Sequence, residues 1–486
     1  MVVNKLVKQR MAKFKLPSIK IPRWQMPKIR MPELRIDGLV CKLPIVQGGM
    51  GVGISLARLA SAVAREGGIG VIAANAIGMG EPDYFSNGKE ANKRALRQEI
   101  RKARKKTRGV IGVNIMVAVN DFHNMLNVCL EERVDIVFLG AGLPLKGIPV
   151  DQLRQRNVKI APIVSSARAA RLIFTYWQKH YSAVPDAVVV EGPMAGGHLG
   201  FKQEQIDDPG YILEKIIPQV VEEIYTFEKH FKKEIPVIAA GGIFSGDDIY
   251  KFLRLGASGV QMGSRFVATR ECDADIRFKE SYIGSRKEDI VLIKSPVGLP
   301  GRAIKNRFLE EVDSGVKKFF RCPWRCLESC DARNAKYCIS EALNNARQGK
   351  LDEGFAFAGT NAYRIDRIVP VKELIQELKS EYVMVIEKWT VSLRDEYERA
   401  LKKLKLLRKQ YAVAFERGIR SLKDEYKKVA LKGSVAFREE VEHTMALANR
   451  LKAEYIDYIE KVIDLKEQLF RVVVPAVSIN TPGRGF

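Results

Sequence analysis

Residues 188–201, Val-Val-Val-Glu-Gly-Pro-Met-Ala-Gly-Gly-His-Leu-Gly-Phe, carry the strongest structural signal in this chain. The β-branched run that opens the segment predicts a buried parallel strand, and the glycines after it predict a loop. Glycines let the backbone approach a flat ligand, and His198, held between Gly197 and Gly200, is the side-chain type that titrates near neutral pH. The segment therefore predicts a strand that delivers a histidine to a ligand site. The alternative is a turn whose histidine is satisfied by the backbone.

Two further strands downstream of this histidine also end in glycines. Residues 235–246 read Ile-Pro-Val-Ile-Ala-Ala-Gly-Gly-Ile-Phe-Ser-Gly, and residues 257–266 read Ala-Ser-Gly-Val-Gln-Met-Gly-Ser-Arg-Phe. A (β/α)8 barrel binds phosphate at the loops after its last two strands. Backbone N–H groups in such loops can converge on a dianion. The predicted phosphate site consists of Gly241, Gly242, Gly263 and Ser264.

The rest of the region alternates strand-like and helix-like segments. The expected strands are 44–47, 69–73, 110–116, 135–140, 159–164, 187–190, 235–240 and 259–262. The expected helices are 55–66, 91–106, 122–132, 167–180, 218–231 and 247–255. Continuously apolar strands that alternate with helices predict an α/β fold with a parallel sheet covered by helices. A closed (β/α)8 TIM barrel is favoured over an open doubly wound sheet, whose first turn would normally carry GxGxxG.

Five motifs in this order resemble the nitronate monooxygenase (2-nitropropane dioxygenase) family. They are Pro-Ile-Val-Gln-Gly-Gly-Met at 44–50, Gly-Val-Asn-Ile-Met at 112–116, Glu-Gly-Pro-Met-Ala-Gly-Gly-His at 191–198, Ala-Gly-Gly-Ile at 240–243 and Val-Gln-Met-Gly-Ser-Arg-Phe at 260–266. The FMN-dependent enoyl-acyl-carrier-protein reductases share much of this pattern. The resemblance covers about residues 39–315 and implies an FMN-dependent oxidoreductase, with FMN held non-covalently at the C-terminal mouth of the barrel.

The resemblance also implies roles for single residues. Gly49 and Met50 would lie against the isoalloxazine ring, and Asn114 would hydrogen-bond the flavin. Gly197 would approach the ring, while the four residues of the predicted phosphate site would hold the phosphate. His198 would be the catalytic histidine, accepting a proton while the flavin carries the electrons.

The activity that the resemblance implies is oxidation of alkyl nitronates by flavin and molecular oxygen, which releases a carbonyl compound and nitrite. Two alternatives stay open. One is an FMN-dependent enoyl-acyl-carrier-protein reductase, which would need NAD(P)H. The other is a catalytically silent flavoprotein scaffold tethered by its terminal arms, although the intact His198 and phosphate glycines argue against silence.

A chain of 486 residues is too long for one barrel and suits a barrel with appendages. We expect an N-terminal arm at 1–38, the barrel at 39–315, a cysteine-containing cap segment at 316–375, and a C-terminal α-helical hairpin with a tail at 376–486. Lys and Arg exceed Asp and Glu by 24, but no nucleic-acid motif accompanies this charge, and no nucleic-acid partner is expected. No apolar run reaches the ~18 residues of a membrane span, so a cytoplasmic protein, at most peripheral to a membrane, is expected.

Both ends of the chain differ in composition from the barrel. Residues 16–35 hold four repeats of the form apolar–Pro–x–apolar–polar, which predict an extended, PPII-like segment. This arm would contact an anionic membrane surface or a protein partner, or pack along its own barrel or a neighbouring subunit. From about residue 371, apolar residues recur every three or four positions in two series separated by Gly433. They predict a coiled-coil-like hairpin that serves binding or assembly into an oligomer, or that docks on the barrel.

Four of the seven cysteines fall close together, at Cys322, Cys326, Cys330 and Cys338. Soft thiolates in an intracellular protein select zinc or an iron–sulfur cluster, and an all-sulfur ligand set favours the cluster. The spacing C-x3-C-x3-C-x7-C matches neither a zinc ribbon nor a ferredoxin. The alternative is a small cap packed with buried thiols.

Overall fold

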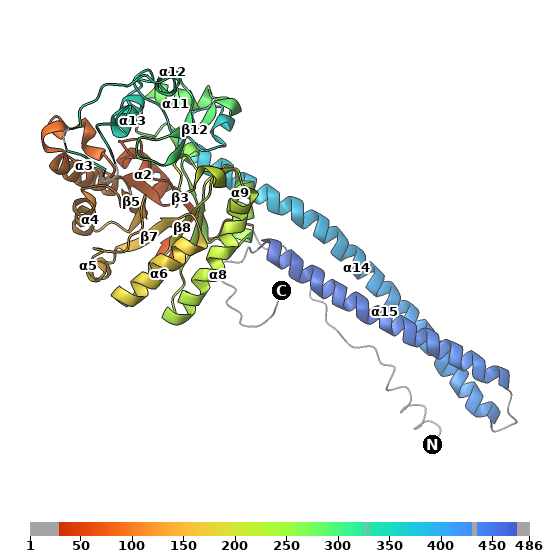
Figure 1. The fold of residues 1–486 in the computed structure, drawn as a ribbon. Coiled ribbons are helices and arrows are strands. Elements are labelled where there is room, and N and C mark those ends of the chain that lie inside the picture. Colours follow the sequence, from red (N-terminus) through yellow and green to blue (C-terminus); the bar gives the residue numbers. More distant parts are fainter. Residues whose placement is uncertain (1–28, 323, 328–329, 430–434, 474–486) are drawn as a thin grey trace. The chain divides into compact units, whose positions relative to one another are not determined.

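The computed structural model describes residues 29–473 apart from 323, 328–329 and 430–434. Most of the N-terminal repeats, Gly433 and the C-terminal tail therefore lie outside the described residues. The described chain forms two compact units, which divide between Val383 and Met384. Figure 1 shows the barrel unit and the helical hairpin unit, and each is described here by itself.

Eight parallel strands form the core of the first unit, in the order β3-β11-β10-β8-β7-β6-β5-β4. Their bounds are β3 Ile45–Gln47, β4 Gly70–Ala73, β5 Ile111–Met116, β6 Ile136–Gly140, β7 Lys159–Val164, β8 Val188–Glu191, β10 Val237–Ala240 and β11 Gly259–Met262. A parallel bridge from Val46 to Ile69 joins the first and last strands of this order, which closes the ring. The predicted (β/α)8 barrel is confirmed.

Helices cover the outside of the barrel, as the alternating pattern predicts (Figure 1). They are α2 Ala57–Arg65, α3 Tyr84–Lys106, α4 Phe122–Glu131, α5 Val150–Gln155, α6 Ala167–Tyr181, α8 Leu213–Phe231 and α9 Gly246–Arg254. Two one-turn helices, α7 Gln203–Ile206 and α10 Ser264–Val267, follow β8 and β11 in the chain, and short 3-10 turns lie at Ile77–Gly80 and Pro209–Tyr211. The barrel is filled by strand side chains, and every residue of β4 and β10 is buried. A small hairpin, β1 Leu34–Ile36 and β2 Leu39–Cys41, packs Leu34 and Ile36 into the same apolar core.

The chain after the barrel strands returns to the carboxyl ends of the strands. Its elements are α11 Ile276–Ile283, β12 Ile290–Lys294, β13 Pro300–Ile304, α12 Arg307–Asp313 and α13 Ile339–Arg347, with 3-10 turns at Lys287–Asp289 and Ala362–Arg364. Strand β13 pairs with the short β9, Gly197–His198, so the histidine loop is extended into a second sheet. The first turns of α14, Val371–Val429, also belong to this unit, because Glu381 accepts a hydrogen bond from the Gly246 N–H at 2.7 Å and Tyr382 is fully buried.

The second unit consists of the rest of α14 and of α15, Val435–Val473, paired antiparallel. Tyr397 and Ala400 pack against Val462, Leu465 and Leu469. Further along, Leu404 and Leu407 pack against Tyr455 and Ile459. The predicted C-terminal helices are therefore present. None of the helices in the described ranges is long and apolar enough to cross a membrane.

Candidate active site

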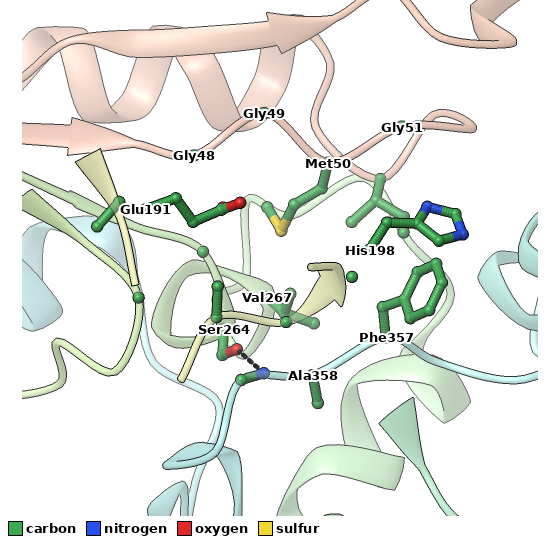
Figure 2. Close-up of a pocket in the computed structure, with 18 of the residues that line it drawn as sticks. Gly48, Gly49, Met50, Gly51, Glu191, His198, Ser264, Val267, Phe357 and Ala358 are labelled. Carbon is green, nitrogen blue, oxygen red and sulfur yellow. Dashed lines mark hydrogen bonds between the residues drawn. The ribbon is translucent and has the colours of Figure 1, made fainter. Parts of the chain in front are cut away.

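The carboxyl ends of the barrel strands surround a cavity of about 320 Å³, a size typical of small-molecule sites. Figure 2 shows loops from several strands converging on it. The structure brings all nine residues of the predicted flavin site to the lining of this cavity. They are Gly49, Met50, Asn114, Gly197, His198, Gly241, Gly242, Gly263 and Ser264.

The cavity depends on backbone segments that pass close to other atoms. A Cβ added at Gly49 would lie 2.3 Å from the Cβ of Asn114, and one at Gly196 would lie 2.5 Å from the carbonyl carbon of Ala358. Real Cβ atoms do not approach this closely, so side chains there would force these segments apart. The loop after β3 and the histidine loop therefore need glycine at these two positions.

The predicted phosphate site has the free donors that a phosphate requires. In the described chain, the backbone N–H groups of Gly241, Gly242, Gly263 and Ser264 make no hydrogen bond. Gly241 and Gly242 adopt the left-handed φ values of +93° and +81°, which turn the backbone after β10. A Cβ built on Gly263 would have no atom within 4 Å, so space is open at that point. These groups fit the phosphate of FMN, which they would hold through backbone N–H donors.

Charged side chains close to this predicted phosphate site are held by contacts of their own. Asp248 lies near it in sequence, but its carboxylate accepts hydrogen bonds from the backbone N–H groups of Phe244 and Ser245 and so caps α9. Arg265 forms a 2.9 Å ion pair with Glu377, and its guanidinium carbon lies 4.4 Å from the centroid of the Phe244 ring. The Arg364 guanidinium carbon lies 4.2 Å from the same centroid. Two cations therefore contact the ring that follows the phosphate glycines, and neither was predicted.

His198 is held by partners far away in sequence. Its Nε2 lies 2.7 Å from the Oγ of Ser295, and its ring packs edge-on against Phe357, with centroids 5.0 Å apart (Figure 2 labels His198 and Phe357). Burial lowers the pKa of His198 to about 4, so the imidazole is neutral at pH 7. The sequence suggests that residues 294–302 and 352–363 return to the mouth of the barrel, but it assigns no individual role to Ser295 or Phe357 within them.

A buried arginine fixes the loop that carries His198. The Nη1 of Arg302, on β13, donates to the carbonyl oxygens of Pro193 at 2.5 Å and Ala195 at 2.7 Å. The backbone of Arg302 pairs with Gly197, and its carbonyl oxygen accepts from the N–H of Ala358. One residue therefore ties the histidine loop, β13 and the returning chain together.

Glu191 is a second titratable group in the cavity. It ends β8, and its side chain extends into the cavity near the loop of Gly48, Gly49 and Met50 (Figure 2). Its carboxyl group makes no hydrogen bond with any residue that the structure describes. Burial raises the pKa of Glu191 to about 7. Glu191 is the first residue of the motif at 191–198, but the motif does not indicate that its carboxyl group lacks a hydrogen-bond partner among the described residues.

The cap segment covers part of the cavity, but its cysteines do not form the predicted metal site. Leu327, Ile339, Ser340 and Leu343 line the cavity, and no cysteine does. Among the residues with assigned positions, no three His, Cys, Asp or Glu side chains are arranged to hold a metal ion. Cys322 is exposed, while the Sγ of Cys326 lies 3.9 Å from the Oγ of Ser340. Burial raises the pKa of Cys338 to about 11, which favours the protonated thiol. The prediction of an iron–sulfur cluster or zinc at Cys322, Cys326, Cys330 and Cys338 is therefore not supported.

A TIM barrel whose mouth combines free phosphate donors, glycine-lined walls and a buried neutral histidine defines a class of protein: a barrel oxidoreductase that binds FMN. The sequence model described as nitronate monooxygenase matches residues 33–125 and 108–381 of this chain. The protein belongs to the nitronate monooxygenase family and is an FMN-dependent oxidoreductase.

Known proteins agree with this assignment. A "Probable nitronate monooxygenase" of Staphylococcus aureus (strain JH9) is 28% identical over 312 residues, which is 56% of this chain and 78% of the relative. The structure of FabK from Thermotoga maritima superposes with a TM-score of 0.56 at 29% identity, covering 72% of this chain and 95% of FabK. Nitroalkane oxidase from Streptomyces ansochromogenes, at 24% identity, shares the fold with a TM-score of 0.55 over 71% of this chain and 96% of its own.

Proposed function

We propose that this protein oxidises alkyl nitronates with molecular oxygen, with FMN in the cavity and His198 as the proton acceptor. The observation that carries the proposal is a buried histidine, neutral at pH 7, that lines the same cavity as the predicted phosphate site. FMN, when bound, supplies the electron transfer and the reaction with oxygen. The protein supplies binding, orientation and control of the proton.

The contacts of His198 support its role in proton transfer. One ring nitrogen, Nε2, is committed to the Ser295 hydroxyl, and no other hydrogen bond of this ring is found in the described chain. The remaining nitrogen is left to exchange a proton with a ligand. A pKa of about 4 keeps the imidazole unprotonated at pH 7 and therefore free to accept a proton, while making it a weaker base than an exposed histidine.

The cap provides the apolar side of the proposed substrate site. Leu327, Ile339 and Leu343 line the cavity together with Met116 from β5. Such side chains favour an alkyl chain over a polar one, because burial of apolar surface contributes about 25 cal/mol per Å². We assign the alkyl group of the substrate to this side.

The test of the proposal is the replacement His198→Asn, assayed on two forms of one substrate. The variant should keep its flavin yet lose roughly 10²–10⁴-fold in activity towards the neutral nitroalkane, because general-base catalysis is worth about that much. Oxidation of the preformed nitronate, which has no proton to give up, should suffer less. An equal loss on both forms would contradict the proton-acceptor role.

Anaerobic mixing separates nitronate oxidation from the nicotinamide-dependent alternative. We expect nitronate alone to bleach the flavin of the purified protein. Bleaching by NADH or NADPH, with none by nitronate, would instead favour the enoyl-acyl-carrier-protein reductase activity.

A further inference from the structure

Residues 324–327 of the cap segment are fixed on the barrel by contacts at both ends. At the first end, the ring of Trp324 lies edge-on to that of Tyr84 on α3, with centroids 5.9 Å apart. A Cβ built on Gly88, also on α3, would lie 2.3 Å from the indole Nε1 of Trp324. Real Cβ atoms do not approach this closely, so Trp324 can pack here only because residue 88 is glycine. We call this contact the Trp324 anchor.

The other end of the segment is joined to the loop after β5. Leu327 forms an antiparallel bridge with Val119. The backbone N–H of Asn120 donates to the carbonyl oxygen of Cys326 at 3.1 Å, and its side-chain Nδ2 donates to the carbonyl oxygen of Arg325. Backbone contacts at three consecutive positions therefore fix the place from which the Leu327 side chain extends.

Leu327 is the residue of this segment that reaches the cavity. It lines the cavity and is 5% exposed, whereas Trp324, Tyr84 and Gly88 lie outside the lining. Strand β5, whose loop holds Leu327, also contributes Met116 to the same lining. The segment therefore delivers one apolar side chain to the cavity and is held in place by residues that do not touch it.

Leu327 differs from the other aliphatic side chains that the cap contributes. Ile339 and Leu343 lie four positions apart on one face of α13, and both line the cavity. Among the described cap residues of the lining, Leu327 alone precedes α13. A change in its size therefore changes the room in the cavity without altering a helix.

We propose that Leu327 limits the length of the alkyl chain that the cavity accepts, and that the Trp324 anchor holds Leu327 in this position. The inference rests on the proposed oxidation of alkyl nitronates and names the substrates selected, which are short, unbranched nitronates. The cavity of about 320 Å³ has to hold the flavin ring as well, so little room is left for a chain. A chain that is too long would have to displace a packed leucine, which is unfavourable.

Replacements of Leu327 change this room in both directions. In Leu327→Ala, the ratio of kcat/KM for hexyl nitronate to that for ethyl nitronate should rise by about tenfold or more, since each newly buried methylene is worth roughly fourfold. Leu327→Phe should lower the same ratio. The matched control is Leu309→Ala on α12, which truncates a buried leucine outside the lining and should leave the ratio unchanged.

Gly88→Ala tests the Trp324 anchor without touching the cavity. The added Cβ displaces the indole, so Leu327 loses its support and the hexyl-to-ethyl ratio should rise, as in Leu327→Ala. Trp324→Ala should act in the same direction. Trp324→Phe keeps an aromatic ring against Tyr84 and should stay near the wild-type ratio. These residues are outside the predicted flavin site, so flavin content, measured by absorbance, should stay at the wild-type level.

A binding measurement on the flavin-loaded protein separates this inference from the proposed function. Straight-chain carboxylates share the planar, two-oxygen anionic end of a nitronate, and titration of the flavin absorbance gives a Kd for butyrate and for octanoate without turnover. Leu327→Ala should strengthen octanoate binding relative to butyrate by about tenfold or more, for the same reason as in the kinetic test. If this shift occurs although no nitronate reduces the flavin, the proposed reaction is wrong and the role of Leu327 stands.

Three results would overturn the inference. The first is a chain-length ratio that is the same in the wild type, Leu327→Ala and Leu327→Phe, in turnover and in binding. The second is an equal change of that ratio in Leu309→Ala, which would indicate general loosening of the fold. The third is a failure of every chain length to bind or react, which would remove the alkyl site itself. An unchanged ratio in both Gly88→Ala and Trp324→Ala would refute the role of the Trp324 anchor.

Discussion

Replacing Glu191 with glutamine should change how the stability of the protein depends on pH. The carboxyl group is in the cavity at the end of β8, without a hydrogen-bond partner among the described residues, and burial raises its pKa from 4.5 to about 7. An amide of the same shape removes this titration and keeps the packing. The variant therefore isolates the cost of holding a carboxylate in the cavity of the flavin-free protein.

The size and sign of the effect follow from the two pKa values. The difference between about 7 in the folded chain and 4.5 in the unfolded chain corresponds to about 3 kcal/mol, at ~1.4 kcal/mol for each pH unit. Because the folded chain holds this proton more tightly, the stabilisation is fully present below pH 4.5 and is lost as the pH rises through 7. The wild type should therefore lose on the order of 3 kcal/mol relative to Glu191→Gln between these limits. His198 has the opposite sign: its lowered pKa costs stability as the pH falls from 6.5 towards 4 in both proteins.

The measurement is urea unfolding of flavin-free protein at pH 5 and pH 8. We expect the free energy of unfolding of Glu191→Gln, relative to the wild type, to be higher at pH 8 than at pH 5. The matched control is Glu204→Gln, which changes an exposed carboxylate and should leave the pH dependence unaltered. If Glu191→Gln differs from the wild type by the same amount at both pH values, the buried-carboxyl argument is refuted.

Three further predictions concern the frame of the site. Gly49→Ala should lose bound FMN, measured by absorbance after desalting, because its Cβ would lie 2.3 Å from a neighbouring side-chain atom; Gly80→Ala, with no atom within 4 Å, should not. A chain that ends at Val383 should keep FMN, whereas one that ends at Ser380 should be destabilised by about 3–5 kcal/mol in urea, because it lacks a fully buried tyrosine. Cys326→Ala should release neither iron nor zinc from anaerobically purified protein, and release of either, detected by elemental analysis, would restore the metal interpretation.

The barrel could be predicted because its evidence is local. Each of its strands is a short apolar run bounded by glycine or polar residues, and the runs recur with helices between them. Helix α5, Val150–Gln155, was missed because six residues with a charged face give too little periodicity. The predicted phosphate site could be proposed for the same reason as the strands. Its residues form two pairs of neighbours, one directly after β10 and one directly after β11.

The remaining parts of the site come from distant parts of the chain. Ser295 reaches His198 across 97 positions, and Arg302 reaches Pro193 across 109. Nothing in the local pattern of either residue specifies that contact. The four clustered cysteines show that nearness in sequence can also mislead. Their close spacing suggested that they bind one metal centre, but the described residues do not place the thiols in the geometry of a metal site.

The two titratable groups of the cavity predict a pH limit for nitronate oxidation. With His198 at a pKa of about 4 and Glu191 at about 7, both side chains are uncharged between these values. Above pH 7 the Glu191 carboxylate shares the cavity with an anionic substrate, and like charges in a buried site repel strongly. We expect kcat/KM for a preformed nitronate to fall by up to tenfold per pH unit above about 7 in the wild type, and to stay flat in Glu191→Gln over the same range. Stopped-flow reduction of the flavin across pH 6–9 measures this. A fall of the same size in both proteins would place the titrating group elsewhere and leave Glu191 with a structural role.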